Sequence, residues 1–411
     1  MCSLNENDVK NVLNNFLENE TNNQIINYKI LEKSDESLGY LGKHLTLFVQ
    51  YFYHGKKEER KFFIKTHGGS NRENDFLEVT GIFQREIDFY KILVGECNKY
   101  VNNIIKWCPK YCFSKNRILV LEDLSEKGFV MVDGDINLDE EHAEKALQAF
   151  SRLHASSLLL EMKKSIQLDA DYPDLFREVL YDESNTESPT ARWISWQIQD
   201  LLVGIDLLKN YSQKEKIIIK EKFKEQMMRI YALNKKSKMY KNVISHGDPW
   251  KNNLMFNYNE KNNPDSCVLV DFQFFRYAPP AHDVMQFLYF TTKKITRDNN
   301  KEKFLNYYYD NLSIELQKEN ENINNVISKR EFLQSCDFYK ELAVIQSLLS
   351  MHYLLGPVTL NVDDENYDVY ENYLENHRHE YMRKFFQNES YSDKIIEIFS
   401  ELIDDYILMK K

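Results

Sequence analysis

The sequence predicts an α+β protein with two lobes, a small β-rich N-lobe over residues 1–124 and a large, mainly helical C-lobe over residues 125–411. Short runs rich in aromatic and β-branched residues, which are typical of strands, are concentrated before residue 124. After that point, apolar residues recur at three- and four-residue steps, which is typical of helices. Because 43% of the 411 residues are hydrophobic, the chain has enough apolar surface to form a core in each lobe.

The N-lobe is predicted to contain an antiparallel sheet and one helix. Strands are expected at residues 25–30, 45–53 and 61–66, because turn-forming or charged stretches separate these runs. A helix is expected next, because apolar residues recur there at helical spacing. These residues are Phe76, Val79, Phe83, Ile87, Tyr90 and Leu93. Two further short strands, at residues 111–113 and 117–121, complete the predicted lobe.

The C-lobe is predicted to be helical, with two brief returns of the strand pattern. Helices are expected at residues 140–162, 191–210, 213–234, 281–292, 301–316, 330–355 and 393–408. The strand pattern returns at residues 254–256 and 267–272. Polar stretches are expected to form surface loops, and none is long enough to link separate domains. These stretches are residues 182–190, 260–266 and 319–325.

Charge and cysteine content limit the partners that the protein could have. A formal net charge of −11 and a pI near 5.5 give no general basic surface, so we expect no nucleic-acid partner. A chain of this size needs no covalent cross-links, so we expect free thiols and a reducing compartment. The six cysteines are Cys2, Cys97, Cys108, Cys112, Cys267 and Cys336. Cys108 and Cys112 could be half of a metal site, but no second Cys or His pair accompanies them.

The beginning of the chain predicts neither export nor membrane insertion. Residues 1–20 are polar and Asn-rich, without the basic start and apolar stretch of a secretory signal. No apolar run approaches the roughly 20 residues that span a bilayer. We therefore expect a cytoplasmic protein without a membrane span, and the sequence implies no protein partner.

The most informative polar residues lie between positions 246 and 273. His246, Asp248 and Asn253 form an H-x-D-x-x-x-x-N pattern, and Asp271 follows an apolar run. Phosphoryl transfer to an alcohol needs a carboxylate near the attacking hydroxyl and ligands for the metal that neutralises the phosphates. We expect Asp248 to accept the hydroxyl proton, while Asn253 and Asp271 hold Mg²⁺. His246 is expected to brace the loop by hydrogen bonding to the backbone.

A competing interpretation is that these residues only form turns. Asp and Asn are common in loops, and either one alone would indicate nothing more. Their spacing, with an apolar strand on each side, favours the catalytic interpretation.

The N-lobe offers residues that could anchor a nucleotide. Lys65 ends an apolar strand, where it can reach the α- and β-phosphates, and Glu86 on the following helix could pair with it. Lys61 is the competing lysine, but it stands beside charged residues and is expected to face solvent. Gly39 and Gly42 lie between two strands, where glycine lets backbone amides approach phosphate. Two glycines in a hairpin are also typical of an ordinary turn.

Together, these features resemble the ecdysteroid kinase-like family, also called CHK-kinase-like. This family lies within the protein-kinase-like superfamily, which includes choline kinases and aminoglycoside phosphotransferases. The resembling segments run in order over residues 39–290. They are Gly39-Tyr40-Leu41-Gly42, Phe63-Ile64-Lys65, Glu86 with Phe89-Tyr90, Leu121-Glu122-Asp123-Leu124, Phe150-Ser151-Arg152-Leu153-His154, His246-Gly247-Asp248-Pro249-Trp250-Lys251-Asn252-Asn253, Asp271-Phe272-Gln273 and Pro280-Ala281-His282-Asp283.

The resemblance implies a bilobal protein-kinase-like fold, the cofactors ATP and Mg²⁺, and phosphorylation of a hydroxyl on a small molecule. An ecdysteroid-like or other hydroxylated lipophilic compound is the substrate that the family's name suggests. The implied roles are catalytic base for Asp248, metal ligands for Asn253 and Asp271, nucleotide anchors for Lys65 and Glu86, adenine-bordering hinge for Glu122, Asp123 and Leu124, and support of the catalytic loop for His246 and Asp283. No motif matches after about residue 300.

Several rival functions stay open at this point. Protein kinases usually place Arg between the catalytic-loop His and Asp, where this chain has Gly247, and residues 271–283 are too short for a long peptide-docking loop. A choline or ethanolamine kinase typically has Glu where this chain has Gln273. A bacterial antibiotic kinase fits less well because of Trp250 and Asn252.

Two further points bear on function. A non-catalytic nucleotide-binding scaffold would be expected to lack at least one of the proposed catalytic, metal-binding and nucleotide-anchoring residues, and all are present. Trp193 and Trp196 could line an apolar substrate pocket, although their three-residue spacing on a helix is more typical of a core.

Overall fold

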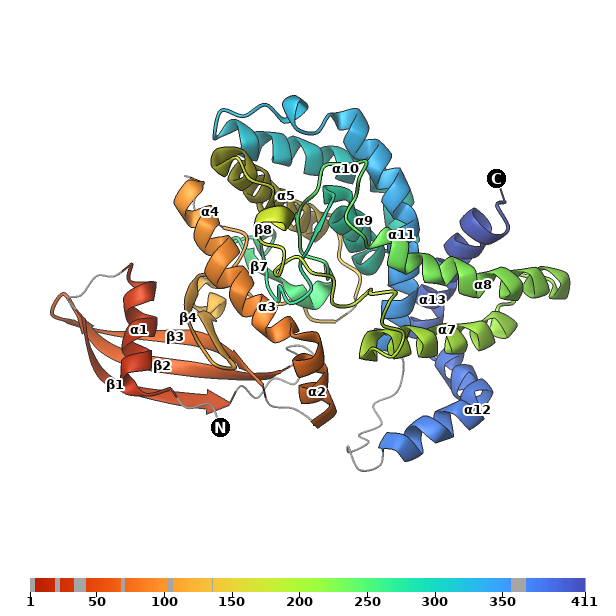
Figure 1. Cartoon of the computed structure of the whole chain (residues 1–411), viewed down its shortest axis with the longest axis horizontal. Coiled ribbons are helices and arrows are strands. Elements are labelled where there is room, and N and C mark those ends of the chain that lie inside the picture. The colour runs from red at the N-terminus through yellow and green to blue at the C-terminus, as the bar shows by residue number, and fades with distance from the viewer. Residues whose placement is uncertain are drawn as a thin grey trace.

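Five antiparallel strands form the sheet of the N-lobe, at the left of Figure 1. The computed structural model describes residues 4–18, 23–32, 42–67, 71–101, 106–134, 136–355 and 367–410. The strands are β1 Asn23–Glu32, β2 Lys43–Tyr53, β3 Lys56–Thr66, β4 Tyr111–Lys115 and β5 Ile118–Glu122, in the spatial order β1-β2-β3-β5-β4. All five predicted strands are confirmed.

A short helix that the sequence did not predict, α1 Glu6–Phe16, covers one face of this sheet. A reciprocal pair of hydrogen bonds caps its first turn. The Asp8 amide donates to the Asn5 side chain, and the Asn5 amide donates to the Asp8 carboxylate, both at 3.0 Å. Val12 then packs with Leu47 of β2 in a small core of the N-lobe. The polar, Asn-rich composition of residues 1–20 concealed this helix.

The single helix predicted between residues 76 and 93 is wrong, because Gly81 interrupts it. Gly81 has φ of 68°, a left-handed conformation that ends one helix before the next begins. The observed elements are α2 Asn71–Thr80, α3 Ile82–Asp88, a π-helical turn Phe89–Val94 and α4 Gly95–Tyr100. Glu86 therefore lies on the short α3.

Helices make up most of the C-lobe, and all seven predicted ones are confirmed with shifted ends. They are α5 Glu140–Lys164, α7 Pro189–Leu207, α8 Gln213–Leu233, α9 Pro280–Thr291, α10 Lys294–Gln317, α11 Lys329–Leu355 and α13 Glu389–Leu402, which a π-helical turn Ile403–Ile407 extends. The sequence did not predict α6 Leu168–Asp171 or α12 Tyr367–Gln387. The predicted α+β fold class, an N-terminal antiparallel sheet followed by a mainly helical remainder, is confirmed.

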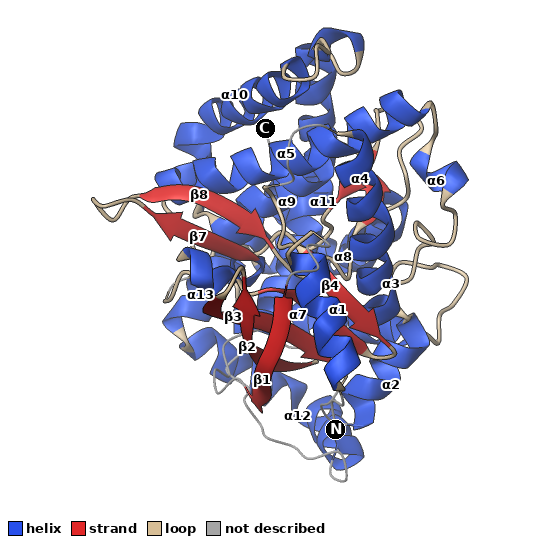
Figure 2. Ribbon diagram, turned by 90° about the vertical axis from the view of Figure 1, so that its left-hand side faces the viewer, coloured by secondary structure: helices blue, strands red, loops and turns tan. Residues whose placement is uncertain are grey.

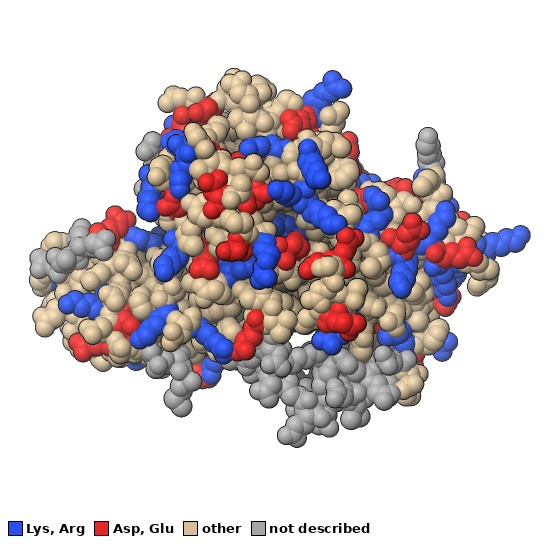
Figure 3. Space-filling view, in the orientation of Figure 1, with Lys and Arg blue, Asp and Glu red and all other residues tan. Residues whose placement is uncertain are grey.

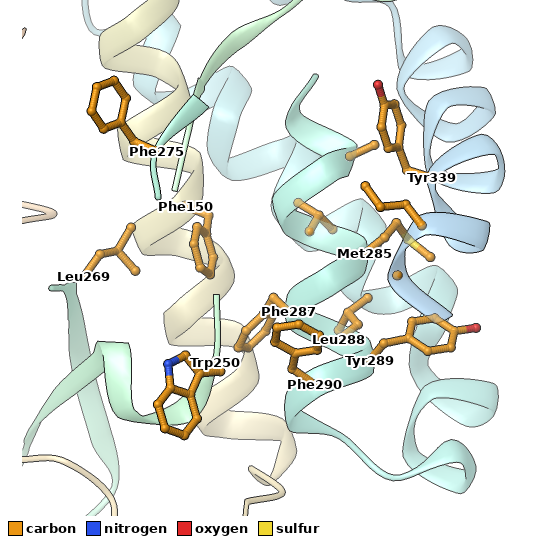
Figure 4. Close-up of a cluster of buried hydrophobic side chains, with 14 of the residues drawn as sticks. Phe150, Trp250, Leu269, Phe275, Met285, Phe287, Leu288, Tyr289, Phe290 and Tyr339 are labelled. Atoms are coloured by element: carbon orange, nitrogen blue, oxygen red, sulfur yellow. The ribbon is translucent and has the colours of Figure 1, made fainter. Parts of the chain in front are cut away.

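Helix α9 lies at the centre of the C-lobe core. All twelve of its residues are buried, as expected for a helix that is mainly apolar around its circumference. Figure 4 shows Phe287 and Phe290 on the side of α9 toward Phe150, while Met285 points toward Tyr339 of α11. The helix therefore gives a fixed base to the loops that precede it.

Two short two-stranded sheets carry the loops of interest. Strand β6 Val243–Ser245 pairs with β9 Arg276–Ala278. Between them in the chain, β7 Leu254–Tyr258 and β8 Pro264–Leu269 form a hairpin (Figure 2). The predicted strand at residues 267–272 ends earlier, at Leu269, so Asp271 lies in a loop. Its φ of 63° is unusual for a residue with a side chain.

Within the described parts of the chain, none of the helices combines the length and apolar composition needed to cross a membrane. The five described cysteines are buried free thiols, and Cys2 lies outside the described residues. Figure 3 shows basic and acidic side chains interspersed over the visible face.

Candidate active site

The loop between β6 and β7 begins with a tight backbone turn at Gly247. This residue has φ of 81°, and a Cβ there would lie 2.1 Å from the carbonyl oxygen of Phe274. The buried Asp283 of α9 accepts hydrogen bonds from the backbone amides of His246, at 2.6 Å, and Gly247, at 3.0 Å. The loop is therefore anchored to the central helix, and no side chain fits at position 247.

Asp283 is itself held by a buried polar chain. The Nε2–H of His154 on α5 donates to the Asp283 carboxylate at 3.0 Å, and the Tyr308 hydroxyl donates to His154 Nδ1 at 2.6 Å. Burial alone would raise the pKa of Asp283, but His154 and His282 hold it well below its usual value. The predicted supporting position of Asp283 thus has a clear physical basis.

Asp248 and Asn253 face each other across the loop. The Asn253 side-chain amide donates both to the backbone oxygen and to the carboxylate of Asp248, each at 2.9 Å. Burial, together with the nearby Asp271 charge, raises the pKa of Asp248 to about 7. The Asn253 hydrogen bond and the positive charges of Arg276 and Lys65 act in the opposite direction.

Lys65 joins the two lobes through two carboxylates. Its Nζ lies 2.7 Å from Glu86 Oε2 and 2.9 Å from Asp271 Oδ1. Burial opposes the charge of Lys65, which is 4% exposed, but Asp271 and Glu86 outweigh this effect and raise its pKa above the ordinary value. Lys61, the competing lysine, instead lies 5.6 Å from the centre of the Phe48 ring.

The residues next to Asp271 are fixed by aromatic packing. The Phe272 ring stacks on Phe89 at 4.3 Å with an interplanar angle of 10°, and it contacts His246 at 4.6 Å. The Nε2–H of His246 donates to the backbone oxygen of Val270 at 3.0 Å. His246 therefore makes the backbone hydrogen bond that the sequence pattern led us to expect.

An open cavity between the lobes collects most of the predicted site residues. Its lining includes Lys65, Glu86, Glu122, Asp123, Leu124, Asn253 and Asp271. The Asp123 side chain is used locally, because it accepts a hydrogen bond from the Ser125 amide at 3.0 Å. Glu122 forms an ion pair with Lys127. Both side chains are therefore engaged with neighbouring residues.

The predicted glycine loop is described only at its end. Gly39 lies outside the described residues. Gly42 has φ of 92°, and a Cβ there would lie 3.1 Å from the Thr66 backbone oxygen and 3.7 Å from Lys65 Cγ. Gly42 therefore lets the chain pass close to the end of β3.

Asn253 and Asp271 form a donor set that fits Mg²⁺. The Val270 amide donates to the Asn253 backbone oxygen at 3.0 Å, which brings the two segments together. Because the Asn253 nitrogen faces Asp248, its amide oxygen is the atom left for a metal. Mg²⁺ prefers such oxygens and usually completes its shell with substrate phosphates and water. Among the described residues, no cluster of three or more His, Cys, Asp or Glu side chains is arranged to hold a metal.

Sequence reasoning missed two buried arginines at this site. Arg85, beside Glu86, donates to the backbone oxygens of Leu175, at 3.0 Å, and Phe275, at 2.8 Å. Arg276 on β9 is 7% exposed and lies against the loop between β6 and β7, next to Gly247. Neither arginine belongs to a recognisable motif, so its burial becomes visible only in the fold. The one sequence signal for a role of Arg276 at this site was its position, five residues after Asp271.

A model of the ecdysteroid kinase-like family matches residues 39–321. The comparison with curated proteins gives no match.

Three solved structures are among those similar to the chain. The gentamicin complex of APH(2″)-IIa is 14% identical, with a TM-score of 0.39, over 96% of this chain and 99% of that one. The streptomycin–ATP complex of APH(2″)-IIa is 16% identical, with a TM-score of 0.34, over 93% and 99%. A choline/ethanolamine kinase family protein from Mesorhizobium loti is 12% identical, with a TM-score of 0.37, over 90% and 92%.

Proposed function

The chain belongs to the ecdysteroid kinase-like family, and from this premise we propose that it is a phosphotransferase that uses Mg-ATP to phosphorylate a hydroxyl of a small molecule. One observation carries the proposal. Lys65, Glu86, Asn253 and Asp271, which come from four separate segments, converge on one cavity, and Asp248 is hydrogen-bonded to Asn253 at the same place. A constellation of this kind supplies the groups that phosphoryl transfer requires.

Each proposed role follows from what the side chain can do. Lys65 binds the nucleotide phosphates, and Glu86 holds its ammonium group in place. Asn253 and Asp271 hold Mg²⁺, which neutralises charge on the phosphates when bound. Asp248 orients the acceptor hydroxyl and takes its proton as the phosphoryl group is transferred. The backbone of residues 122–124 borders the adenine.

A small molecule is the proposed acceptor because the catalytic loop lacks the features that serve peptide substrates. The place of the usual protein-kinase Arg is held by Gly247, where a Cβ would collide with Phe274. Between Asp271 and the first residue of α9, Pro280, the chain forms only β9 and short turns. This leaves little room for a peptide-docking segment.

The identity of the acceptor is a finer proposal. A hydroxylated lipophilic compound, such as a steroid alcohol, is our first candidate, and choline or ethanolamine is the alternative. Trp193 is half-buried against the hydrophobic core, and the centre of its ring lies 6.2 Å from that of Tyr353. Tyr353 itself is 52% exposed.

A panel assay tests the proposal directly. The purified chain is incubated with Mg-ATP and steroid alcohols, terpenoid alcohols, phenols, choline or ethanolamine, and ADP release and phosphorylated product are measured. We expect product with at least one alcohol and none with generic peptides. Robust phosphorylation of the peptides would contradict the proposed substrate class, and preference for choline would favour the alternative.

A further inference from the structure

Arg276 places a buried guanidinium group beside the catalytic loop. It lies on β9, opposite Ser245 of β6, and its Nε is 3.3 Å from the position that a Cβ of Gly247 would occupy. Because the backbone at Gly247 packs against Phe274, the loop itself cannot carry a side chain there. The cation next to the loop therefore comes from a different segment, five residues after Asp271.

Arg276 is held by partners on two other segments. Its Nη1 donates to the Asn234 side-chain oxygen at 2.6 Å and lies 3.5 Å from Glu178 Oε2. Its guanidinium carbon lies 5.1 Å from the centre of the Tyr181 ring. A buried charge is stable only when it is compensated in this way.

Glu178 links this cation to a folded stretch of backbone. Its Oε1 accepts hydrogen bonds from the amides of Val179, Leu180 and Tyr181, at 3.1, 2.9 and 3.0 Å. The Tyr181 hydroxyl in turn donates to Gln346 of α11 at 2.7 Å. The Glu178 carboxylate therefore accepts hydrogen bonds from the backbone of residues 179–181 and also pairs with Arg276.

Arg85 fixes the same two regions from the N-lobe side. It is 9% exposed, and its Nη2 bridges the backbone oxygens of Leu175 and Phe275. Its neighbour in sequence, Glu86, is the partner of Lys65. Arg85 of the N-lobe and the Arg276–Glu178 pair of the C-lobe therefore both connect residues 175–181 to residues 272–276, directly beside the catalytic loop.

We propose that Arg276 and Glu178 form a built-in positioning pair that keeps the catalytic loop and the acceptor side of the site in their active arrangement without phosphorylation. The proposal rests on the proposed function. Protein kinases order their activation loops through contacts between arginines and an added phosphate. Here an Arg from β9 and a carboxylate from Glu178 make a cation–anion contact within the unmodified chain.

Two substitutions remove the pair with little change in shape. Glu178→Gln keeps an oxygen that can accept from the three amides and removes the negative charge. Arg276→Met keeps an apolar stem of similar length. Arg297→Met is the matched control, because Arg297 on α10 is also buried and pairs with Glu401, away from the proposed site.

Hydrogen–deuterium exchange of the full chain tests the positioning role without turnover. We expect about tenfold faster exchange at residues 175–181 and 244–249 in Glu178→Gln, and no such change there in Arg297→Met. The double variant Glu178→Gln/Arg276→Met should exchange about as fast as Arg276→Met alone, because both changes break one interaction. Unchanged exchange in both segments of Glu178→Gln, or an equal change in the control, would overturn the proposal.

A second measurement addresses the site itself. With water as the acceptor, Glu178→Gln should release ADP from saturating Mg-ATP about tenfold more slowly, while the Mg-ATP Kd changes less than about twofold. Phosphatase treatment of the unmutated protein should leave its rate of ADP release unchanged. A loss of rate after that treatment would refute the proposal that the pair keeps the site active without phosphorylation. If the unmutated protein turned over no substrate at all, the proposed function would fail, and the exchange result would still decide the positioning role.

Discussion

At the scale of single residues, the proposed site depends on charges that are buried because they are paired. Lys65 is held between Glu86 and Asp271, so a strand and a helix of the N-lobe meet a loop of the C-lobe at one ammonium group. Removing one partner of a buried ion pair typically costs about 3–5 kcal/mol, because the remaining charge loses its compensation. These three residues therefore act as a unit.

The first prediction compares two lysines of β3, Lys61 and Lys65. Lys65→Met should weaken Mg-ATP binding by at least about tenfold, because it removes the group that meets the phosphates and leaves two carboxylates close together. Lys61→Met should bind Mg-ATP normally, because Lys61 lies over the Phe48 ring of β2 and not among the residues that line the cavity. Calorimetric titration of both variants makes the comparison. A larger loss for Lys61→Met would show that the phosphate anchor is wrongly assigned.

The sequence identifies Lys65, Asp248 and Asn253 as candidate site residues because each lies only a few positions along the chain from an apolar strand. It gave no role to Arg85 or Arg276. These arginines act through backbone oxygens and partners far along the chain, and no local spacing encodes such contacts.

At the scale of elements, local patterns predicted helices and strands well but missed interruptions. The apolar periodicity continues across Gly81, although a left-handed residue there separates α2 from α3. Helix α1 was missed because its apolar residues are few and its capping box is polar. The three-residue strands β6 and β9 are too short to give a pattern, and they exist because tertiary pairing brings Ser245 opposite Arg276.

The second prediction concerns the turn at Gly247. Gly247→Ala should lower the free energy of unfolding well beyond the roughly 1–2 kcal/mol typical of a left-handed alanine, because its Cβ would also meet Phe274. Gly55→Ala is the control, because Gly55 has φ of 76° but no atom lies within 4 Å of its Cβ position. Urea denaturation measures both. Equal losses in the two variants would mean that the loop does not pack tightly against residue 274.

At the scale of the whole molecule, the C-lobe is organised around polar groups buried with α9. His246 and His282 are both fully enclosed, and burial lowers the pKa of each below its ordinary value. The Nε2–H of His282 donates to Asn234 at 3.1 Å, and the same Asn234 oxygen accepts from Arg276. Stability of the lobe is therefore coupled to the neutral state of these histidines.

The third prediction follows from the direction of these shifts. Because the folded pKa values lie below those of the unfolded chain, the unfolded state binds more protons as pH falls through about 6.5. Stability should be fully present above that pH and should decline below it, with a slope of up to about 1.4 kcal/mol per pH unit for each histidine. Thermal unfolding between pH 8 and pH 5 gives the slope. His282→Gln should reduce it, and a melting temperature independent of pH over this range would contradict the account.

Phosphoryl transfer by Asp248→Asn, measured beside the unmutated protein with the alcohol found in the panel, tests the proposed catalytic role of Asp248. Asp248 is proposed to orient and deprotonate the acceptor hydroxyl, so the variant should lose about 10²–10⁴-fold in rate. Its affinity for Mg-ATP should stay within a few-fold, because Asp248 is not a proposed ligand of the nucleotide or the metal. Transfer at the unmutated rate by Asp248→Asn would contradict the proposed mechanism.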